Sequence, residues 1–328
     1  MDAEIPAALE LSATPDLEHA RQLGEAWMRS MRSGDFARAW EVSDEVLRSR
    51  RGTSCFHLPR HFQWVWDGSP LVGKRVLIRC YHGLGDTIQF IRYAPLVREI
   101  AAHVTVLAQP ELAPWLRTVR GIDAVLPLDE GEPEVEFEAD VEVMELPHVF
   151  RSTVETVPTE IPYLHVQPAE LLRGRRSPGQ PPRLQVGLTW KCGDFALERS
   201  IPGALLSPLA DIPGVALHIF QRGSGLREWS GAPGVDSGSD HIPEAARRIA
   251  ALDLMISIDS MPAHLAGALG VPTWVLLRAE ADWRWMDGRA DSPWYPTMRL
   301  FRQAREGDWK PVAERVAAEL QRLALARG

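Results

Sequence analysis

The sequence predicts an α/β protein with two doubly wound, Rossmann-like domains and a small helical hairpin at its N-terminus. Apolar runs of strand length alternate with helical segments between residues 74 and 127, and the same alternation starts again at Leu184. Between these stretches, residues 173–183 combine glycines and prolines with four arginines, a composition that offers no packing face. We therefore expect two domains, each built on a parallel sheet, joined by a linker at 173–183.

Composition excludes several classes of protein. Of the 328 residues, 45% are hydrophobic and 24% charged, as in soluble globular domains, and the net charge of −8 argues against a nucleic-acid partner. No apolar run approaches the roughly 18–20 residues that span a bilayer, and the acidic start Met1-Asp2-Ala3-Glu4 is not that of a signal peptide. Three scattered cysteines give no disulfide framework, so we expect a reduced, cytoplasmic protein.

The segment 1–66 is predicted to form two helices. Thr14-Pro15-Asp16 is a helix start, and Ser33-Gly34-Asp35 separates two runs of helical spacing. Their apolar faces comprise Leu17, Ala20, Leu23, Trp27 and Met31, then Phe36, Ala39, Trp40, Ser43 and Leu47. The pair resembles one tetratricopeptide hairpin, but a lone repeat has no neighbours to bury its faces. We expect a helical cap on the next domain, and a protein-docking surface remains an alternative.

The first domain is predicted over residues 67–172. Strands are expected at 75–80, 104–108 and 124–127, and helices at about 86–101 and 111–119. The acidic stretch 129–145 is expected to be an exposed strand or a solvated loop, because its glutamates alternate. No metal site is expected there, since hard cations need convergent oxygens, and the chain has no Asp-x-Asp pair.

The second domain is predicted over residues 184–305. Its strands are expected at 184–190, 215–220, 254–258 and 273–277, with helices at about 243–251 and 261–269. Residues 306–328 are expected to hold a last helix that buries Val312, Val316, Leu320 and Leu323.

A glycine turn, Gly83-Leu84-Gly85-Asp86, lies between a buried strand and a helix in the first domain. Glycines let the backbone turn tightly and let a ligand approach it, and the helix start offers free N–H groups. A dinucleotide fingerprint is excluded, because Ile88 replaces its third glycine and Gln109 stands where an acid would bind the ribose. Asp86 is either a helix cap or a catalytic acid at the ligand-binding edge of the sheet.

A second turn, from Asp259 to His264, repeats this geometry in the second domain. Ser260 and the amides at the helix start suit a diphosphate, with Met261 at the first helical position and His264 one turn further. His264 also fits a structural role as a buried, hydrogen-bonded histidine. Lys191 and Arg199 follow a predicted strand end, where cations can clamp phosphates, although most surface charges are only solvated.

Together these segments resemble family-9 glycosyltransferases, the ADP-heptose:lipopolysaccharide heptosyltransferases and their relatives. The resemblance covers about residues 67 to 325 and is closest to a bacterial branch that carries tetratricopeptide helices. The matching segments are Gly83 to Phe90 (GLGDTIQF), Asp259–His264 with the following LAGALG, DWRW at 282–285, and Asp291–Pro296 through Phe301-Arg302-Gln303.

The resemblance implies a GT-B fold, with two domains facing a cleft, the acceptor on the first and the nucleotide sugar on the second. It implies inversion without a metal and no cofactor beyond a nucleotide diphosphate sugar, with an ADP-linked donor favoured. Asp86 matches the general base, and Ser260, Met261 and the amides after Asp259 match the diphosphate turn that His264 supports. Lys191 and Arg199 match cations that neutralise the leaving group. The expected acceptor is a bacterial glycan or a lipid-linked molecule, as in lipopolysaccharide biosynthesis, which places the protein at the inner face of the inner membrane.

Two departures fall at the donor turn. Met261-Pro262 stands where heptosyltransferases have glycine, and the loop Lys191-Cys192-Gly193-Asp194 is shorter than in relatives with tetratricopeptide helices. Because of these departures, the sequence does not identify the donor sugar. An alternative also remains: a weak or inactive GT-B scaffold that docks partners through its N-terminal helices.

Overall fold

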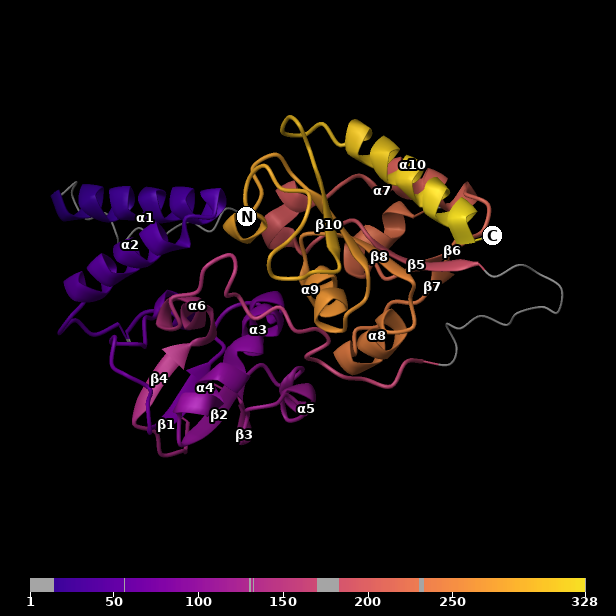
Figure 1. Cartoon of the computed structure of the whole chain (residues 1–328). Helices are drawn as coiled ribbons and strands as arrows, with labels where there is room; N and C mark the ends of the chain where they lie inside the picture. The colour runs from indigo at the N-terminus through magenta and orange to yellow at the C-terminus, as the bar shows by residue number, and fades with distance from the viewer. Residues whose placement is uncertain are drawn as a thin grey trace. The chain divides into compact units, whose positions relative to one another are not determined.

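The computed structural model describes residues 15–169 and 183–327, except 56, 130, 132 and 230–232. The chain forms two compact units, described separately below (Figure 1). The first contains the chain up to Pro158 together with Asp282–Arg289, and the second contains Thr159–Ala281 and the chain from Ala290 onward. The predicted linker lies, apart from Arg183, outside the described residues, as does the predicted helix cap Thr14. Within the described ranges, no helix is long and apolar enough to cross a membrane.

The N-terminal hairpin is present, with α1 at Pro15–Ser33 and α2 at Phe36–Ser49. The turn between them needs a positive φ of 80° at Gly34, and Asp35 caps α2 by accepting a hydrogen bond from the Arg38 N–H. Met31, Phe36, Ala39 and Trp40 of the predicted faces are buried.

The hairpin packs on the first domain through Trp40. This indole is buried, donates from Nε1 to the Ser152 carbonyl at 2.7 Å and stacks on His148 at 5.5 Å. The expectation of a helical cap is therefore confirmed, and the Trp40 ring is not available as part of a docking surface. A second contact joins Asp44 of α2 to His148 and Arg151 at 2.9 and 2.7 Å.

The first unit contains a four-stranded parallel sheet in the order β3-β2-β1-β4. The strands are β1 (Arg75–Arg79), β2 (His103–Ala108), β3 (Ala124–Pro127) and β4 (Ala139–Glu142). The connecting helices are α3 (Leu84–Phe90), α4 (Ala94–Ile100), α5 (Ala113–Leu116) and α6 (Leu146–Val149), and 3-10 turns occupy Arg60–Phe62, Ile91–Tyr93 and Val143–Glu145.

Three expectations for this unit are wrong in detail. The helix expected at 86–101 is split by the turn Ile91–Tyr93, because Pro95 has no N–H and fits only the first turn of α4. The helix expected at 111–119 shrinks to the four residues of α5, which also begins with a proline. The acidic stretch is not merely solvated, since β4 is largely buried and Asp140 pairs with the buried Arg79 at 2.9 Å.

The second unit contains a six-stranded parallel sheet in the order β10-β9-β8-β5-β6-β7. The strands are β5 (Leu184–Thr189), β6 (Val215–Ile219), β7 (Val235–Asp236), β8 (Leu254–Ile258), β9 (Thr273–Leu277) and β10 (Met298–Arg302). Its helices are α7 (Gly203–Leu206), α8 (Ile242–Ile249), α9 (Met261–Ala268) and α10 (Lys310–Arg327), with 3-10 segments at Asp194–Arg199, Ser207–Asp211 and Gly223–Glu228.

Helices cover both faces of this sheet, as a doubly wound fold requires. α7 and α10 bury one face, where Val312, Val316 and Leu320 join Trp190 and the strand residues in one core, while Leu323 is only partly buried. α8 and α9 cover the opposite face (Figure 1). The α/β class and the two parallel-sheet domains are therefore confirmed. β7 and β10 are strands that the sequence did not predict, and β4 lies in the stretch for which an exposed strand or a loop was expected.

Candidate active site

Asp86 lies on α3, immediately after the carboxyl end of β1. Its Oδ2 accepts a hydrogen bond from the Gly83 N–H at 3.0 Å, so it satisfies an amide at the helix start. Neither Gly83 nor Gly85 has a positive φ, so this turn does not depend on a backbone conformation that only glycine adopts easily. A Cβ on Gly83 would lie 3.2 Å from Oδ2 of Asp86, so glycine there makes room for the carboxylate.

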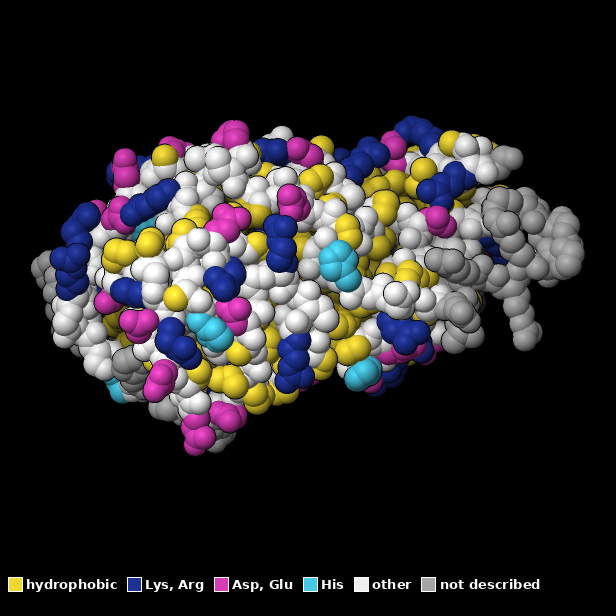
Figure 2. Space-filling model, turned by 60° about the horizontal axis from the view of Figure 1, so that its bottom comes forward, with side chains coloured by type: hydrophobic (Ala, Val, Ile, Leu, Met, Phe, Trp, Pro, Cys, Tyr) yellow, Lys and Arg dark blue, Asp and Glu magenta, His cyan; other side chains and the backbone are white. Residues whose placement is uncertain are grey.

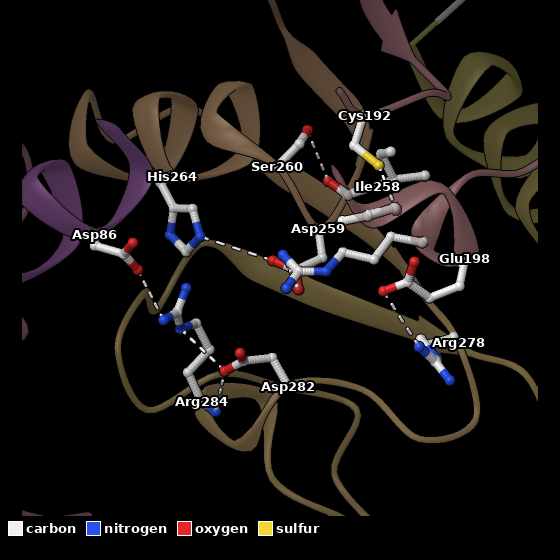
Figure 3. A network of polar contacts seen from close by, with 12 residues as sticks. Asp86, Cys192, Glu198, Ile258, Asp259, Ser260, His264, Arg278, Asp282 and Arg284 are labelled. Atoms are coloured by element: carbon white, nitrogen blue, oxygen red, sulfur yellow. Dashed lines mark hydrogen bonds and ion pairs between the residues drawn. The ribbon is translucent and has the colours of Figure 1, made fainter. Parts of the chain in front are cut away.

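The other oxygen of Asp86 forms an ion pair with Arg284. Nη2 of Arg284 donates to Oδ1 at 2.8 Å, and Nε of the same guanidinium lies 3.2 Å from Oδ1 of Asp282 (Figure 3). The Arg284 side chain is 8% exposed and that of Asp86 is 20% exposed, so the pair is largely screened from water while one edge of the carboxylate remains reachable. Arg284 belongs to a 3-10 turn at Trp283–Trp285, and its guanidinium packs 5.4 Å from the Trp283 ring.

The start of α3 is held by a second set of contacts. Thr87 donates from its hydroxyl to the Gln109 side chain at 3.0 Å, and Gln109 donates to the His82 carbonyl at 2.7 Å. Gln109 follows β2 at the position where a dinucleotide-binding domain carries an acid. Here its hydrogen bonds stabilise the glycine turn.

Strand order places Asp86 at the position where open α/β sheets bind ligands. β1 has β2 on one side and β4 on the other, so the connections leave in opposite directions at its carboxyl end. Glu142 ends β4 beside β1, with Arg79 as its register partner. It is buried, and burial raises the pKa of its carboxyl well above the usual range, with smaller contributions from the nearby charges of Glu145 and then Asp86.

The second unit has the same arrangement at the carboxyl ends of β5 and β8. These neighbours are the point at which its strand order reverses, and the Thr189 hydroxyl donates to Ser257 at 2.7 Å across them. Asp259 and Ser260 follow β8 directly and precede α9. The Ser260 hydroxyl makes no helix-capping bond, and Pro262 removes one N–H from the first turn.

Asp259 lies between two of the predicted residues, Arg199 and His264. It is buried, its Oδ2 lies 3.5 Å from Nη1 of Arg199, and its Oδ1 lies 3.8 Å from Nε2 of His264. Figure 3 shows the His264 ring directed toward the Asp259 carboxylate. On the other side of the ring, Nδ1 is 3.1 Å from the hydroxyl of Tyr295, which is fully buried. His264 is therefore held from both sides, as its structural interpretation requires, within the ligand-facing turn.

Lys191 stands apart from this cluster and pairs with Glu228 at 2.7 Å. The side chain of Gln221 fixes the backbone at Lys191, accepting from the Trp190 and Lys191 N–H groups and donating to the Lys191 carbonyl. Arg278, after β9, is likewise paired, with Glu198 at 3.6 Å and Glu306 at 3.1 Å. Cations thus line this sheet edge, each with an acidic partner.

Reasoning from the sequence missed several of these groups. They are Arg284, Glu142, Gln221, Glu228 and Tyr295. Only Arg284 and Tyr295 carried a signal, because they lie in the DWRW and Asp291–Pro296 segments that resemble family 9.

Comparison with solved structures identifies the fold. A glycosyltransferase family 9 protein from Veillonella parvula superposes with a TM-score of 0.57 at 13% identity, covering 79% of this chain and 99% of that one. The E. coli ADP-heptose lipopolysaccharide heptosyltransferase II gives a TM-score of 0.53 at 14% identity, covering 77% and 99%. TibC, a dodecameric iron-containing glycosyltransferase of enterotoxigenic E. coli, gives 0.51 at 11% identity, covering 79% and 77%.

Sequence comparison adds one relative. No protein-family model matches the chain. Protein FlbA of Caulobacter vibrioides is 28% identical over 288 residues, which cover 78% of this chain and 48% of FlbA. The chain thus spans about half the length of that relative. The fold is that of family-9 glycosyltransferases, and the resemblance seen in the sequence is confirmed at this level.

Proposed function

We propose that the chain is an inverting glycosyltransferase that moves a sugar from a nucleotide diphosphate sugar to an acceptor hydroxyl. One observation carries the proposal: in a fold shared with family-9 transferases, Asp86 presents a carboxylate at the strand-order reversal of the first sheet. A second ligand-facing turn, Asp259-Ser260, occupies the equivalent place in the second sheet.

Asp86 would act as the general base. A carboxylate has about four lone-pair sites, and the Gly83 amide and Arg284 occupy two of those on Asp86. A site remains for the proton of the acceptor hydroxyl, whose oxygen attacks the anomeric carbon as the bond to the diphosphate breaks. Arg284 is a positioning residue, because it fixes the carboxylate without touching the reacting atoms.

The second unit would bind the donor. We assign the leaving diphosphate to the Ser260 hydroxyl, the Met261 amide and Arg199, with Lys191 as a further cation and His264 as the support of the turn. In this proposal protein cations neutralise the charge on the departing diphosphate, and no metal takes part. Because Pro262 removes an amide, the side chains carry more of the phosphate binding. An ADP-linked donor and a glycan or lipid-linked acceptor fit best, with transfer at the cytoplasmic side of the inner membrane.

The distribution of charge on the surface fits a small or uncharged partner better than a polyanion. On the face shown in Figure 2, basic and acidic side chains are interspersed and no broad basic area stands out. A nucleic-acid surface needs such an area.

Substituting Asp86 by asparagine tests the role of the base. We expect transfer to fall by about 10²–10⁴-fold, while binding of the donor nucleotide, measured by calorimetry, stays within twofold of wild type. Asp211→Asn, on an exposed 3-10 turn, is the matched control and should leave transfer unchanged. Full turnover by the Asp86 variant would sink its assigned role.

A scaffold without activity is the second candidate. It is favoured by the pairing of Lys191 with Glu228 and of Arg199 with Asp259, which occupies both cations. A thermal-shift screen against ADP-, UDP- and GDP-linked sugars separates the two. Stabilisation by one donor class supports the transferase, and no shift with any of them supports the scaffold.

A further inference from the structure

A pocket lined by indole rings lies between the N-terminal hairpin and the sheet of the first unit. A cavity of about 210 Å³ is walled by Trp27, Trp40, Trp64 and Trp283. A neighbouring cavity of about 340 Å³ shares the first three of these rings and extends along apolar side chains of α1 and α2. A mostly apolar pocket with a few polar groups is the usual form of a small-molecule site.

The smaller cavity carries one buried oxygen without a partner. Glu142, which lines it, is only 3% exposed. Its Oε2 accepts from the Met144 N–H at 2.6 Å, whereas Oε1 makes no hydrogen bond within the part of the chain that the structure describes. A buried polar atom of this kind costs stability unless a ligand or a water molecule pairs with it.

The same cavity reaches the surroundings of Asp86. His82, on the turn just before Asp86, forms part of its wall. Trp283, on the opposite wall, is followed directly by Arg284, which holds the Asp86 carboxylate at 2.8 Å. A ligand in the cavity would therefore lie beside the proposed base.

The charges around the cavity restrict the ligand. Two carboxyl groups, Glu142 and Glu145, face it; they repel an anion when ionised and bring it no counter-charge when protonated. The one guanidinium on its wall, that of Arg50, already lies over the Trp64 ring at 4.6 Å, where a ligand cation would otherwise stack. The polar end thus suits a neutral hydroxyl, and the apolar cavity beside it suits a hydrocarbon or aryl part.

We propose that this pocket binds an uncharged acceptor that has a hydroxyl-bearing head and an apolar body. A hydroxyl of the head pairs with Oε1 of Glu142, and the body lies against Trp27 and the apolar side chains of α1 and α2. The hairpin then forms part of the acceptor site. This inference rests on the proposed function only in calling the ligand an acceptor. The pocket and the chemical class of its ligand do not depend on sugar transfer.

The protonation of Glu142 supports this pairing. Burial raises the pKa of its carboxyl well above the usual range, so the group can donate an O–H to a ligand oxygen. Burial also raises the pKa of Glu145 to about 7.

The test is calorimetric binding of n-octyl β-D-glucoside, below its micelle concentration, to the full chain. Octyl β-D-glucuronide differs only by a carboxylate in place of the hydroxymethyl group, and octyltrimethylammonium offers a cation on the same chain. We expect the glucoside to bind at least about tenfold more tightly than the glucuronide, because the added carboxylate would be buried without a counter-charge. Equal affinity for the glucuronide, or tighter binding of the ammonium compound, overturns the inference.

Three variants place the ligand. Glu142→Leu should weaken glucoside binding about two- to tenfold, whereas Glu142→Gln, which keeps a hydrogen-bonding group, should retain most of it. Gly24→Phe should abolish binding without loss of thermal stability, because Gly24 lines the apolar cavity and a Cβ there meets no atom within 4 Å. Glu99→Leu, on the exposed face of α4, is the control.

The outcomes separate the two proposals. Unchanged binding in Gly24→Phe and Glu142→Leu refutes the pocket whatever the enzyme does. If the glucoside binds as expected but no sugar nucleotide raises the thermal stability of the chain, the transferase proposal is refuted and the pocket proposal stands.

Discussion

Substituting Gly267 by alanine should disturb the turn Asp259–His264 through the side chains packed against α9. Gly267 lies on α9, and a Cβ built on it would be 2.4 Å from Cδ1 of Tyr295 and 2.6 Å from Cε of Met298. The methionine end can move, but the Tyr295 ring is fully buried and its hydroxyl holds His264 at 3.1 Å. The added methyl must therefore displace the ring that fixes His264, or shift α9 itself.

The magnitude follows from opposing effects. Alanine gains about 1 kcal/mol over glycine in a helix interior. Overpacking costs about 1–3 kcal/mol, and loss of the tyrosine hydrogen bond costs about 0.5–1.5 kcal/mol. The net expectation is a destabilisation of about 1–3 kcal/mol, or a fall in Tm of about 2–12 °C for a domain of this size. Affinity for ADP should fall about two- to tenfold, since His264 loses its outer partner.

Two measurements check this reasoning. Chemical unfolding gives the stability and calorimetry gives the affinity for ADP, with Tyr295→Phe as the variant that removes only the hydroxyl. Gly24→Ala is the matched control, because the same change on α1 meets nothing within 4 Å and should stabilise slightly. If Gly267→Ala is as stable as Gly24→Ala, the packing argument is wrong. If it binds ADP like wild type, His264 does not depend on Tyr295.

Two further predictions concern charged groups. Glu228→Gln releases Lys191 from its 2.7 Å ion pair and should raise the affinity for ADP by about 1.5- to 5-fold at low salt. Lys191→Met should lower that affinity. If the affinity for ADP falls in both variants, Glu228 positions the lysine instead of competing for it. Burial raises the pKa of Glu145 from 4.5 to about 7, so its contribution to stability is full below pH 4.5 and is lost as pH rises through 7, at most about 3 kcal/mol. Urea midpoints of wild type should therefore fall between pH 5 and 8 relative to those of Glu145→Gln, and parallel curves would contradict the burial of this carboxyl.

The sequence predicts the strands that are mostly apolar and gives a weak signal, or none, for those that owe their place to a partner. β5, β8 and β9 are mostly apolar and buried along nearly their whole length, as in a parallel sheet covered on both faces. β4 reads as part of an acidic stretch, because Asp140 is neutralised by Arg79, more than 60 residues earlier. β10 carries Arg299, whose guanidinium packs over the Phe301 ring at 4.8 Å and pairs with Glu319. Such compensation has no local signal.

The residues of the candidate site also fall into those that the sequence predicts and those that it does not. Local geometry was sufficient to select Asp86, Asp259 and Ser260, since each follows a buried strand and opens a helix. Their partners were not visible, because Arg284 follows Asp86 by 198 residues and Tyr295 follows His264 by 31. The glycine turn shows a further limit: Gly83 leaves room for the Asp86 carboxylate, a reason for glycine at this position that no sequence pattern states.

The segment Asp282–Arg289 explains why the hairpin and Asp86 belong together. The chain leaves the second unit after Ala281, contributes these residues to the first, and returns at Ala290. Within the segment, Arg284 holds Asp86, Trp283 packs on Trp27 of α1 with ring centroids 5.3 Å apart, and Asp287 accepts from Arg32 at 3.0 Å. One short stretch thus contacts both the proposed base and the hairpin. The hairpin therefore bears on the position of Arg284, and through it on Asp86, so its two helices form part of the first unit and not an independent attachment.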